Sequence, residues 1–375
     1  MFTFNGEIFF IPFARCFKGF LCVALVFAIA CSKDKTPLEL EKKTPEITWE
    51  NEPVTVYAPQ SGGVWYPRLL QLDDGTLLCA YDTNENAGTT FIGLSQSKDN
   101  GQTWVKTDPI YVSSFAAANP HLLQTPQGIL CVFREMVSNS SFYIKISKST
   151  DGGRTWTLLS TVDHNSRGLW EPFLQEGPNQ ELMVFYSSES FQPDYSQVIA
   201  MRTSTDHGAT WGKTIIVSKH PLSRDGMPSV VKLSAKEWLC FLEATDEANP
   251  FVIKMVRSTD GGVSWSGRHP VYLPANPNRT ASAPYGIQLQ DGRLLCSFQT
   301  DEDRDEIGLG KVDMKVVSST DNGEHWEDKT TIYGGPFGVW WNSLIQLKDG
   351  TIIAATSTND SGRMAIKLIF GNVKG

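Results

Sequence analysis

Two short apolar runs separated by a turn recur along the chain and predict β-hairpins throughout. Each copy begins with one residue and Pro, or Asn in the last copy, continues through aliphatic residues and a turn, and ends its second apolar run on a polar residue. The copies are YPRLLQLDDGTLLCAYD from Tyr66, NPHLLQTPQGILCVFRE from Asn119, EPFLQEGPNQELMVFYS from Glu171, MPSVVKLSAKEWLCFLE from Met227, APYGIQLQDGRLLCSFQ from Ala283 and WNSLIQLKDGTIIAATS from Trp341. Their spacing of 52 to 58 residues suits a four-stranded unit. The pattern therefore predicts an all-β, six-bladed β-propeller.

A second motif, Ser-x-Asp-x-Gly-x-x-Trp, alternates with the first and occurs five times. The Asp can bond nearby backbone amides in a hairpin turn, the Gly accepts positive φ, and the Trp can pack back over the turn. The Asp and Trp of the five boxes are Asp99 and Trp104, Asp151 and Trp156, Asp206 and Trp211, Asp260 and Trp265, and Asp321 and Trp326. We assign these five Asp boxes to structure, and one blade of six lacks a box.

The missing sixth box predicts how the ring closes. Met364–Phe370 resembles the strand that precedes each box, but no box follows it. Thr48-Trp49 followed by 50–58 resembles the strand after a box. We therefore expect the last blade to be split between the two ends of the chain and to take its outermost strand from about Ile47 to Tyr57. Such pairing removes two open sheet edges.

The first 46 residues are unlike the repeats and resemble an export signal. Arg15 and Lys18 precede the apolar run Gly19–Ala30, and Cys31 follows as the lipidated residue of a bacterial lipobox. Cleavage by an ordinary signal peptidase and a single anchoring helix remain alternatives, although the run is shorter than the about 20 residues of a membrane span. The expected protein is an exported lipoprotein of the outer membrane, on its periplasmic or cell-surface face. The predicted segments are a signal peptide at 1–30, a lipidated tether at 31–46 and one propeller domain at 47–375.

The net charge and the positions of the cysteines limit the classes of partner and ligand that the protein is expected to bind. The net charge of −8 argues against a nucleic acid. Cys79, Cys240 and Cys296 each lie 12 residues after the Pro of their repeat, and Cys131 lies 11 after its own. Equivalent positions in separate blades indicate small buried side chains, not disulfides or metal ligands. We expect a monomer that needs no metal or organic cofactor and meets the membrane only through its lipid anchor.

Candidate chemistry lies on the first motif, because the first strand of each blade lines the central channel of a propeller. The loops at one end of this channel should form a funnel. Two positions of the motif should lie at the same height along the channel axis in all six blades, around that funnel. The residue before Pro is Tyr66, Asn119, Glu171, Met227 or Ala283, with Trp341 before Asn342 in the sixth copy. The residue 15 after Pro is Asp82, Glu135, Ser187, Glu243, Gln299 or Ser357.

Two acids stand out in these sets. Glu171 lies between Trp170 and Pro172, where the other copies carry neutral residues, and Glu243 ends the apolar run WLCFLE of the next copy. Acids from adjacent blades can converge on one substrate bond, so Glu171 and Glu243 are the candidate catalytic pair. Asp82 and Glu135 are further candidates for the site. The alternative for each acid is a solvated or salt-bridged strand end.

Other side chains near these positions suit an oligo- or polysaccharide substrate. Aromatic rings stack on sugar faces, and polar groups bond hydroxyls, although some of the aromatics must belong to the core. The candidates for stacking are Trp65, Tyr66, Trp170, Tyr285, Trp340 and Trp341. The candidates for hydrogen bonding are Asn119, His121, Arg224, Asp225 and Asn342.

Five Asp boxes on six blades resemble the sialidase-type propellers. Within them the chain is most similar to glycoside hydrolase family 93, the exo-α-1,5-L-arabinanases, through Trp170-Glu171-Pro172 and through Glu243, which follows 72 residues later. The segment 224–228 also resembles that family. The resemblance implies a retaining exo-hydrolase of a neutral plant-type glycan, α-1,5-L-arabinan, with Glu171 and Glu243 as its two carboxylates. We favour Glu171 as nucleophile, because a carboxyl that ends an apolar strand is the easier one to keep protonated.

Two alternatives stay open. An exo-α-sialidase would need three Arg to clamp a carboxylate and a Tyr nucleophile. Here Arg68 follows the first Pro, and Arg279 and Arg304 occur only in loops near copies five and six. A surface lipoprotein that binds glycan without cleaving it is the second alternative.

Overall fold

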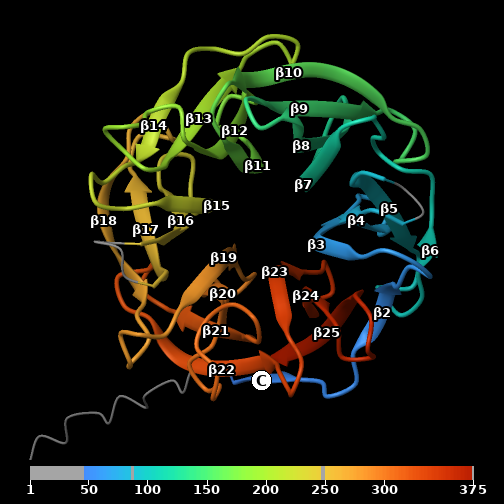
Figure 1. Cartoon of the computed structure of the whole chain (residues 1–375), viewed down its shortest axis with the longest axis vertical. Helices are drawn as coiled ribbons and strands as arrows, with labels where there is room; N and C mark the ends of the chain where they lie inside the picture. The colour runs from blue at the N-terminus through green and yellow to red at the C-terminus, as the bar shows by residue number, and fades with distance from the viewer. Residues whose placement is uncertain (1–45, 86–87, 246–249, 374–375) are drawn as a thin grey trace, which may run out of the picture. The chain divides into compact units, whose positions relative to one another are not determined.

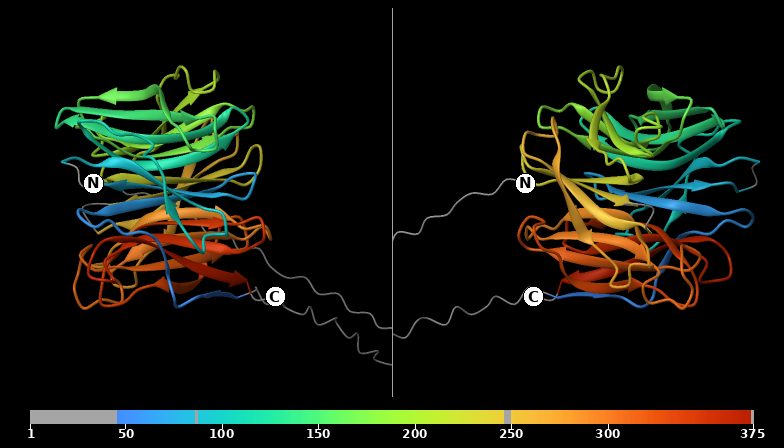
Figure 2. Two further views of the ribbon diagram at one scale, coloured as in Figure 1. Left: turned by 90° about the vertical axis from the view of Figure 1, so that its right-hand side faces the viewer. Right: turned by 60° about the vertical axis from the view of Figure 1, so that its left-hand side comes forward.

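Six antiparallel sheets surround one axis in the computed structural model, which describes residues 46–373 except 86–87 and 246–249. Figure 1 looks down this axis, and Figure 2 shows the same sheets from the side. The all-β, six-bladed propeller predicted from the repeats is confirmed. The predicted signal peptide and Cys31 lie outside the described residues. No helix in the described part of the chain is long and apolar enough to cross a membrane.

The first apolar run of each repeat forms the strand nearest the axis, and the second run forms the next strand outward. The inner strands are β3 (Val64–Gln71), β7 (Ala116–Thr125), β11 (Leu169–Glu176), β15 (Asp225–Lys232), β19 (Ala281–Gln288) and β23 (Val339–Gln346). The second strands are β4 (Leu77–Thr83), β8 (Gly128–Ser138), β12 (Leu182–Ser188), β16 (Trp238–Ala244), β20 (Leu294–Thr300) and β24 (Ile352–Thr358). Every residue of β4, β12, β20 and β24 is buried, because neighbouring blades cover both faces. Their apolar runs are therefore nearly continuous.

The outer half of each blade carries more polar strands. The third strands are β5 (Phe91–Ser97), β9 (Ser141–Ser149), β13 (Val198–Ser204), β17 (Val252–Ser258), β21 (Asp313–Ser319) and β25 (Ala365–Val373). The outermost strands are β6 (Val105–Lys106), β10 (Thr157–Asn165), β14 (Ile215–Ser218), β18 (Ser266–Tyr272) and β22 (Glu327–Tyr333), with β1 (Ile47–Trp49) and β2 (Val54–Tyr57) in the sixth sheet.

The sixth sheet joins the two ends of the described chain. Its order is β1-β25-β24-β23, and β2 also pairs with β25. Ile47 lies opposite Val373, and Val54 lies opposite Leu368. The predicted closure by an N-terminal strand is confirmed, with that strand divided into β1 and β2. β1 and β2 therefore both pair with β25 and cover its otherwise open edge.

The Asp boxes stabilise turns and join neighbouring blades. In the first box, Asp99 Oδ1 accepts hydrogen bonds from Ser97 Oγ (2.7 Å) and from the backbone N–H of Thr103 (2.9 Å). Together with the bond from the Thr103 hydroxyl, these bonds lower the pKa of Asp99 to about 2. The box tryptophans pack across blade boundaries, as where Trp326 meets Phe241 edge-on at 5.5 Å between ring centres.

The four described cysteines, Cys79, Cys131, Cys240 and Cys296, are buried and free, each in the second strand of a different blade. Among the described residues, no group of three or more His, Cys, Asp and Glu side chains is placed to hold a metal ion.

Deleting residues 47–57 should expose the outer edge of β25. We expect a lower melting temperature and concentration-dependent aggregation, because an unpaired strand edge pairs with other chains. Thermal unfolding and light scattering of the truncated and full propellers would measure this. Unchanged melting and a monodisperse truncated protein would contradict the closing role of these strands.

Candidate active site

The residue before the repeat Pro, or before Asn342 in blade six, adopts the same unusual backbone conformation in every blade. A register shift in the pairing of the first two strands marks this point in all six sheets. Positive φ of a non-Gly residue costs on the order of 1–3 kcal/mol, and such bulges redirect side chains. The φ values are 59° for Tyr66, 58° for Asn119, 46° for Glu171, 51° for Met227, 52° for Ala283 and 51° for Trp341. The six predicted positions therefore form one ring, which we call the bulge ring.

A hydrogen bond from the bulge ring to the preceding blade recurs five times. In each case the backbone N–H of the bulge residue donates to a side chain at the end of the second strand. The pairs are Asn119 to Asp82 (2.7 Å), Met227 to Ser187 (3.0 Å), Ala283 to Glu243 (2.9 Å), Trp341 to Gln299 (2.9 Å) and Tyr66 to Ser357 (3.0 Å). These acceptor positions form a second ring, the acceptor ring. Their polar character thus has a structural cause as well as any chemical one.

Blade two departs from this arrangement, and the expectation for Glu135 is wrong. The turn between β7 and β8 is one residue shorter than in β3–β4, since Gln124 pairs with Ile129 whereas Gln71 pairs with Leu77. Arg134, not Glu135, therefore takes the position that corresponds to Asp82. A slip of one residue moves a strand side chain to the opposite face. The sequence did contain a signal, because Cys131 follows its Pro one residue sooner than the other repeat cysteines do.

Glu135 belongs to a structural cluster at the blade edge. Its side chain is 2% exposed and forms an ion pair with Lys145, and it accepts hydrogen bonds from Tyr111 (2.8 Å) and Ser113 (2.7 Å). A tyrosine, a carboxylate and a lysine recur together in other blades. The corresponding groups are Tyr57 of blade six with Glu85 and Lys106 of blade one, and Tyr272 of blade four with Glu302 and Lys329 of blade five.

Residues that follow the repeat Pro close the channel beneath the bulge ring. His121 and Tyr285, both predicted to bind sugar, are each only 7% exposed. The His121 ring lies 3.9 Å from the Phe173 ring, and the Tyr285 hydroxyl lies 3.4 Å from His121 Nε2. Arg68 stacks 3.9 Å from the Tyr66 ring centre. Burial lowers the pKa of His121 to about 3, so this imidazole is neutral and serves packing.

Glu171 and Glu243 converge on the dipeptide Gly226-Met227. Glu171 Oε2 accepts hydrogen bonds from Ser187 Oγ (2.8 Å) and from the Met227 N–H (3.3 Å). Glu243 lies opposite Gly226 in the β15–β16 pair. Burial raises the pKa of Glu243 to about 7, and the charge of Glu171 acts in the same direction. The two predicted catalytic acids therefore lie in one electrostatically coupled site.

A second polar group adjoins this pair. Burial raises the pKa of Asp82 to about 7, opposed by the charge of Arg134. Asn119 Oδ1 accepts a hydrogen bond of 2.7 Å from Arg134 Nε. The structure thus joins Asp82 and Asn119, both predicted for the site, through an arginine that the sequence analysis missed.

The rim of the site contains a paired arginine. Arg224 donates to Glu189 at 2.9 Å, and Glu189 also accepts from Trp170 Nε1 at 3.1 Å. Arg224 and Trp170 are half-buried, and Arg224 opposes the rise in the pKa of Glu243. The hydrogen bond to Glu189 fixes the orientation of the Trp170 indole. Trp170 directly precedes Glu171 in the chain.

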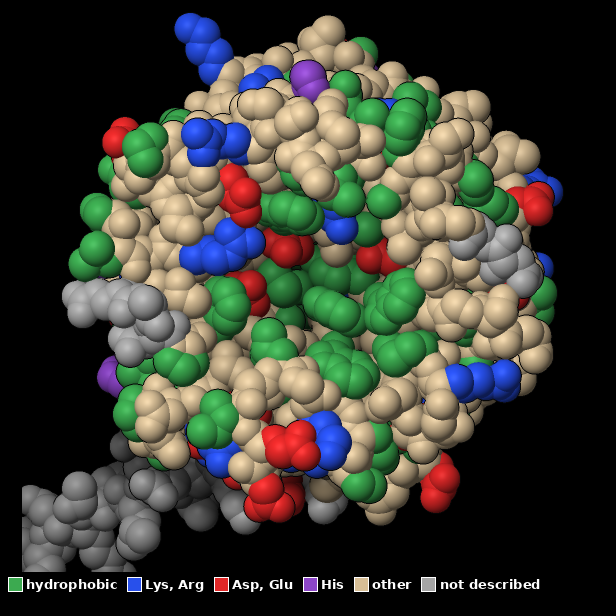
Figure 3. Space-filling view, in the orientation of Figure 1, with side chains coloured by type: hydrophobic (Ala, Val, Ile, Leu, Met, Phe, Trp, Pro, Cys, Tyr) green, Lys and Arg blue, Asp and Glu red, His purple; other side chains and the backbone are tan. Residues whose placement is uncertain are grey.

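An apolar cluster completes the centre of the ring. Tyr66, Met227 and Ala283 pack together, with Trp65 and Trp341 against them. The half-buried indole of Trp340 lies 6.5 Å from that of Trp341 and donates to the Leu309 carbonyl at 2.7 Å. A space-filling view down the axis shows a central hollow where apolar, acidic and basic side chains gather (Figure 3). Aromatic surface and ionisable groups therefore meet at the axis.

Two residues predicted to bond sugar hydroxyls are buried supports. Asp225 is fully buried and accepts hydrogen bonds from Ser218 (2.6 Å), Ser223 (2.7 Å) and Arg268 (2.7 Å). Asn342 is 1% exposed and donates to the Ala283 carbonyl at 3.1 Å. Their hydrogen-bonding capacity is used within the protein, so both expectations for sugar contact are corrected.

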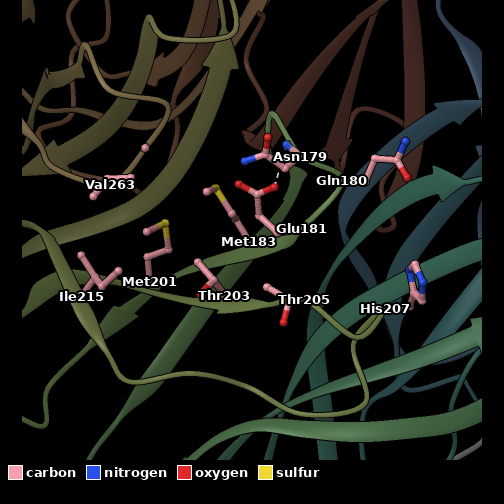
Figure 4. A pocket seen from close by; sticks show the side chains of 11 residues that line it. Asn179, Gln180, Glu181, Met183, Met201, Thr203, Thr205, His207, Ile215 and Val263 are labelled. Atoms are coloured by element: carbon pink, nitrogen blue, oxygen red, sulfur yellow. Dashed lines mark hydrogen bonds between the residues drawn. The ribbon is translucent and has the colours of Figure 1, made fainter.

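A separate pocket of about 390 Å³ lies between blades three and four (Figure 4). Met183, Met201 and Ile215 supply apolar lining, and Glu181 and His207 supply polar lining. None of the residues that line it belongs to the bulge or acceptor ring. It is therefore distinct from the candidate active site.

Residues 48–168 and 159–307 match the BNR repeat-like domain. The chain belongs to this family. Among solved structures, the α-L-arabinanase of Penicillium chrysogenum complexed with arabinobiose is 20% identical, with a TM-score of 0.69 over 86% of this chain and 98% of that one. The family 93 α-L-arabinofuranosidase of Fusarium graminearum is 20% identical, with a TM-score of 0.70 over 85% and 96% of the two chains.

A sialidase of Micromonospora viridifaciens is 25% identical over 228 residues. That match spans 53% of this chain and 34% of the sialidase. The structural likenesses to the family 93 enzymes, and to a microbial sialidase with a TM-score of 0.60, establish a fold shared with glycoside hydrolases of both kinds.

Gly226 leaves space for the Glu243 carboxyl. A Cβ at Gly226 would lie 3.1 Å from Glu243 Oε1 and 2.9 Å from Gln197 Nε2. We expect Gly226→Ala to displace the Glu243 carboxyl. The rate of any reaction in which Glu243 takes part should then fall about tenfold or more, because misplaced catalytic groups lose rate steeply. Gly310→Ala is the matched control, since a Cβ there meets no atom within 4 Å and its φ, like that of Gly226, lies outside the left-handed region. Equal activity of the Gly226→Ala variant would contradict this role.

The raised pKa of Glu243 also predicts a pH-dependent stability. The folded state binds this proton more tightly than the unfolded chain, so the stabilising effect is complete below about pH 4.5 and is lost as the pH rises through about 7. Glu243→Gln should therefore melt higher than the wild type at pH 8 and close to it at pH 4. Thermal unfolding at both pH values would measure the difference.

Glu135→Gln is the control, because it should change the melting temperature at pH 8 in the opposite direction. Burial raises the pKa of Glu135, but the bonds from Lys145, Ser113 and Tyr111 outweigh it and lower that pKa overall. Its ionised form stabilises the fold above the unfolded pKa, so Glu135→Gln should melt lower than the wild type at pH 8. Equal shifts in both variants would refute the distinction.

Proposed function

We propose that the protein is an exo-acting glycoside hydrolase that cleaves a neutral glycan, α-1,5-L-arabinan, with retention of configuration. The observation that carries this proposal is the convergence of Glu171 and Glu243 on Gly226-Met227. The arabinobiose found in the Penicillium and Fusarium structures supports an oligosaccharide as ligand.

The environments of the two acids suggest their roles. Glu243, with a pKa of about 7, retains a proton near neutral pH and suits the acid/base role. Ser187 and Met227 both bond Oε2 of Glu171, which orients its Oε1 for attack. Glu171 is therefore the proposed nucleophile.

The reaction follows as a double displacement. Glu171 attacks the anomeric carbon while the glycosidic bond breaks, and Glu243 gives its proton to the departing oxygen. Glu243 then takes a proton from water as that water attacks the same carbon. This step releases Glu171 and gives a product of unchanged configuration.

The closed base of the channel favours action at a chain end. His121, Phe173 and Tyr285 pack together beneath the bulge ring, so a polymer cannot thread the axis.

The charges favour a neutral sugar. Asp82 and the catalytic pair supply acidic groups, while Arg68 donates to two backbone carbonyls and Arg224 is paired with Glu189. Arg279 and Arg304 pair with Asp301 and Asp313. These four arginines are thus committed to protein partners, and Arg134 alone does not make the clamp of three arginines that a sialidase needs.

Export as a lipoprotein through Cys31 is part of the same proposal, because a surface or periplasmic position would bring the site to polysaccharide fragments.

Glu171→Gln and Glu243→Gln should each lower turnover of linear α-1,5-arabinan by about 10² or more, the scale expected for a positioned acid, base or nucleophile. Product analysis by chromatography should show short arabinose oligomers released by the wild type. A variant of either residue with near-full activity would show that the pair is misassigned.

Sialyllactose, tested in parallel, separates the alternatives. Release of free sialic acid would overturn the arabinanase proposal. Binding of arabino-oligosaccharides without cleavage would favour a non-catalytic glycan-binding protein.

A further inference from the structure

Arg134 is the only cation in the acceptor ring. The other five members accept a backbone N–H from the next blade, and a guanidinium has no acceptor atom. Blade two therefore forgoes the hydrogen bond that supports the strained bulge residue everywhere else. A structural role alone gives no reason for this exchange.

The bulge residue next to this exception is itself exceptional. Glu171 follows Arg134 in the blade order and is the only acid of the bulge ring. The guanidinium of Arg134 interacts electrostatically with both Glu171 and Asp82. The one cation of the acceptor ring thus lies beside the one acid of the bulge ring.

The guanidinium is held in place and retains an unused donor. Its Nε donates to Asn119 Oδ1 at 2.7 Å, and its central carbon lies 4.7 Å from the Trp170 ring centre. Nη1 is buried and has no hydrogen-bond partner within the described part of the chain. A buried donor without a partner is unfavourable unless a ligand supplies the acceptor.

We propose that Arg134 is a substrate-positioning residue whose half-buried side chain donates through its guanidinium to a hydroxyl oxygen of the sugar unit attacked by Glu171. This inference rests on the proposed function and names the contact that orients the sugar. Asn119 and Trp170 fix the guanidinium, so the direction of this donor is set before the substrate binds.

Arg134→Gln tests the inference, because glutamine restores the acceptor that Gln299 supplies in blade five. We expect its melting temperature to equal or exceed that of the wild type, while kcat on α-1,5-arabinan falls about 10²-fold and KM changes less. Arg134→Lys keeps the charge but not the fork of donors, and it should recover only part of the loss. Ser357→Ala removes an acceptor without replacement and should melt a few degrees lower, roughly the effect of losing one buried hydrogen bond.

The two measurements separate the possible failures. An Arg134→Gln variant that melts as low as Ser357→Ala would show a structural arginine and overturn the inference. Near-full activity of Arg134→Gln would overturn it as well. If the wild type does not cleave arabinan, the proposed function fails, yet the melting comparison still decides whether Arg134 supports the fold.

Discussion

The structure depends on a strained residue in the first strand of every blade. Each of the six residues adopts positive φ at a bulge, and five of them are supported by a side chain of the preceding blade. One buried hydrogen bond contributes about 1 kcal/mol, comparable with the lower range of the strain. The bulge turns a side chain toward the axis, and the bond ties adjacent blades together. Architecture and candidate site therefore share the same atoms.

Sharing these positions explains the unusual electrostatics of the site. Glu243 and Asp82 support a neighbouring backbone N–H, as Ser187 and Ser357 do, but they also bring ionisable groups into a buried ring. Burial then raises the pKa of both carboxyls to about 7. A hydroxyl at an acceptor-ring position only accepts the backbone N–H. A buried carboxyl at the same position accepts that N–H and can also bind and release a proton near neutral pH.

Carboxylates elsewhere are stabilised in their charged form. Glu135 has its pKa lowered by Lys145 and two hydroxyls despite burial, and Asp99 has its pKa lowered by hydrogen bonds in its turn. These groups hold blade edges and turns at a distance from the axis. The neighbouring groups that bond each carboxyl, and not the residue type, thus distinguish the structural acids from the candidate catalytic acids.

The spacing of apolar runs and boxes was enough to predict the blade number, the closure and the candidate pair Glu171 and Glu243, because repeats report supersecondary units directly. Sequence alone could not assign Arg134 and Glu135 correctly, since a turn shorter by one residue reverses which side chain faces the funnel. Nor could it show that His121, Tyr285, Asp225 and Asn342 are buried by neighbouring blades. Burial and partners across blades are properties of the assembled ring, so only the tertiary structure decided which polar residues are free to meet a substrate.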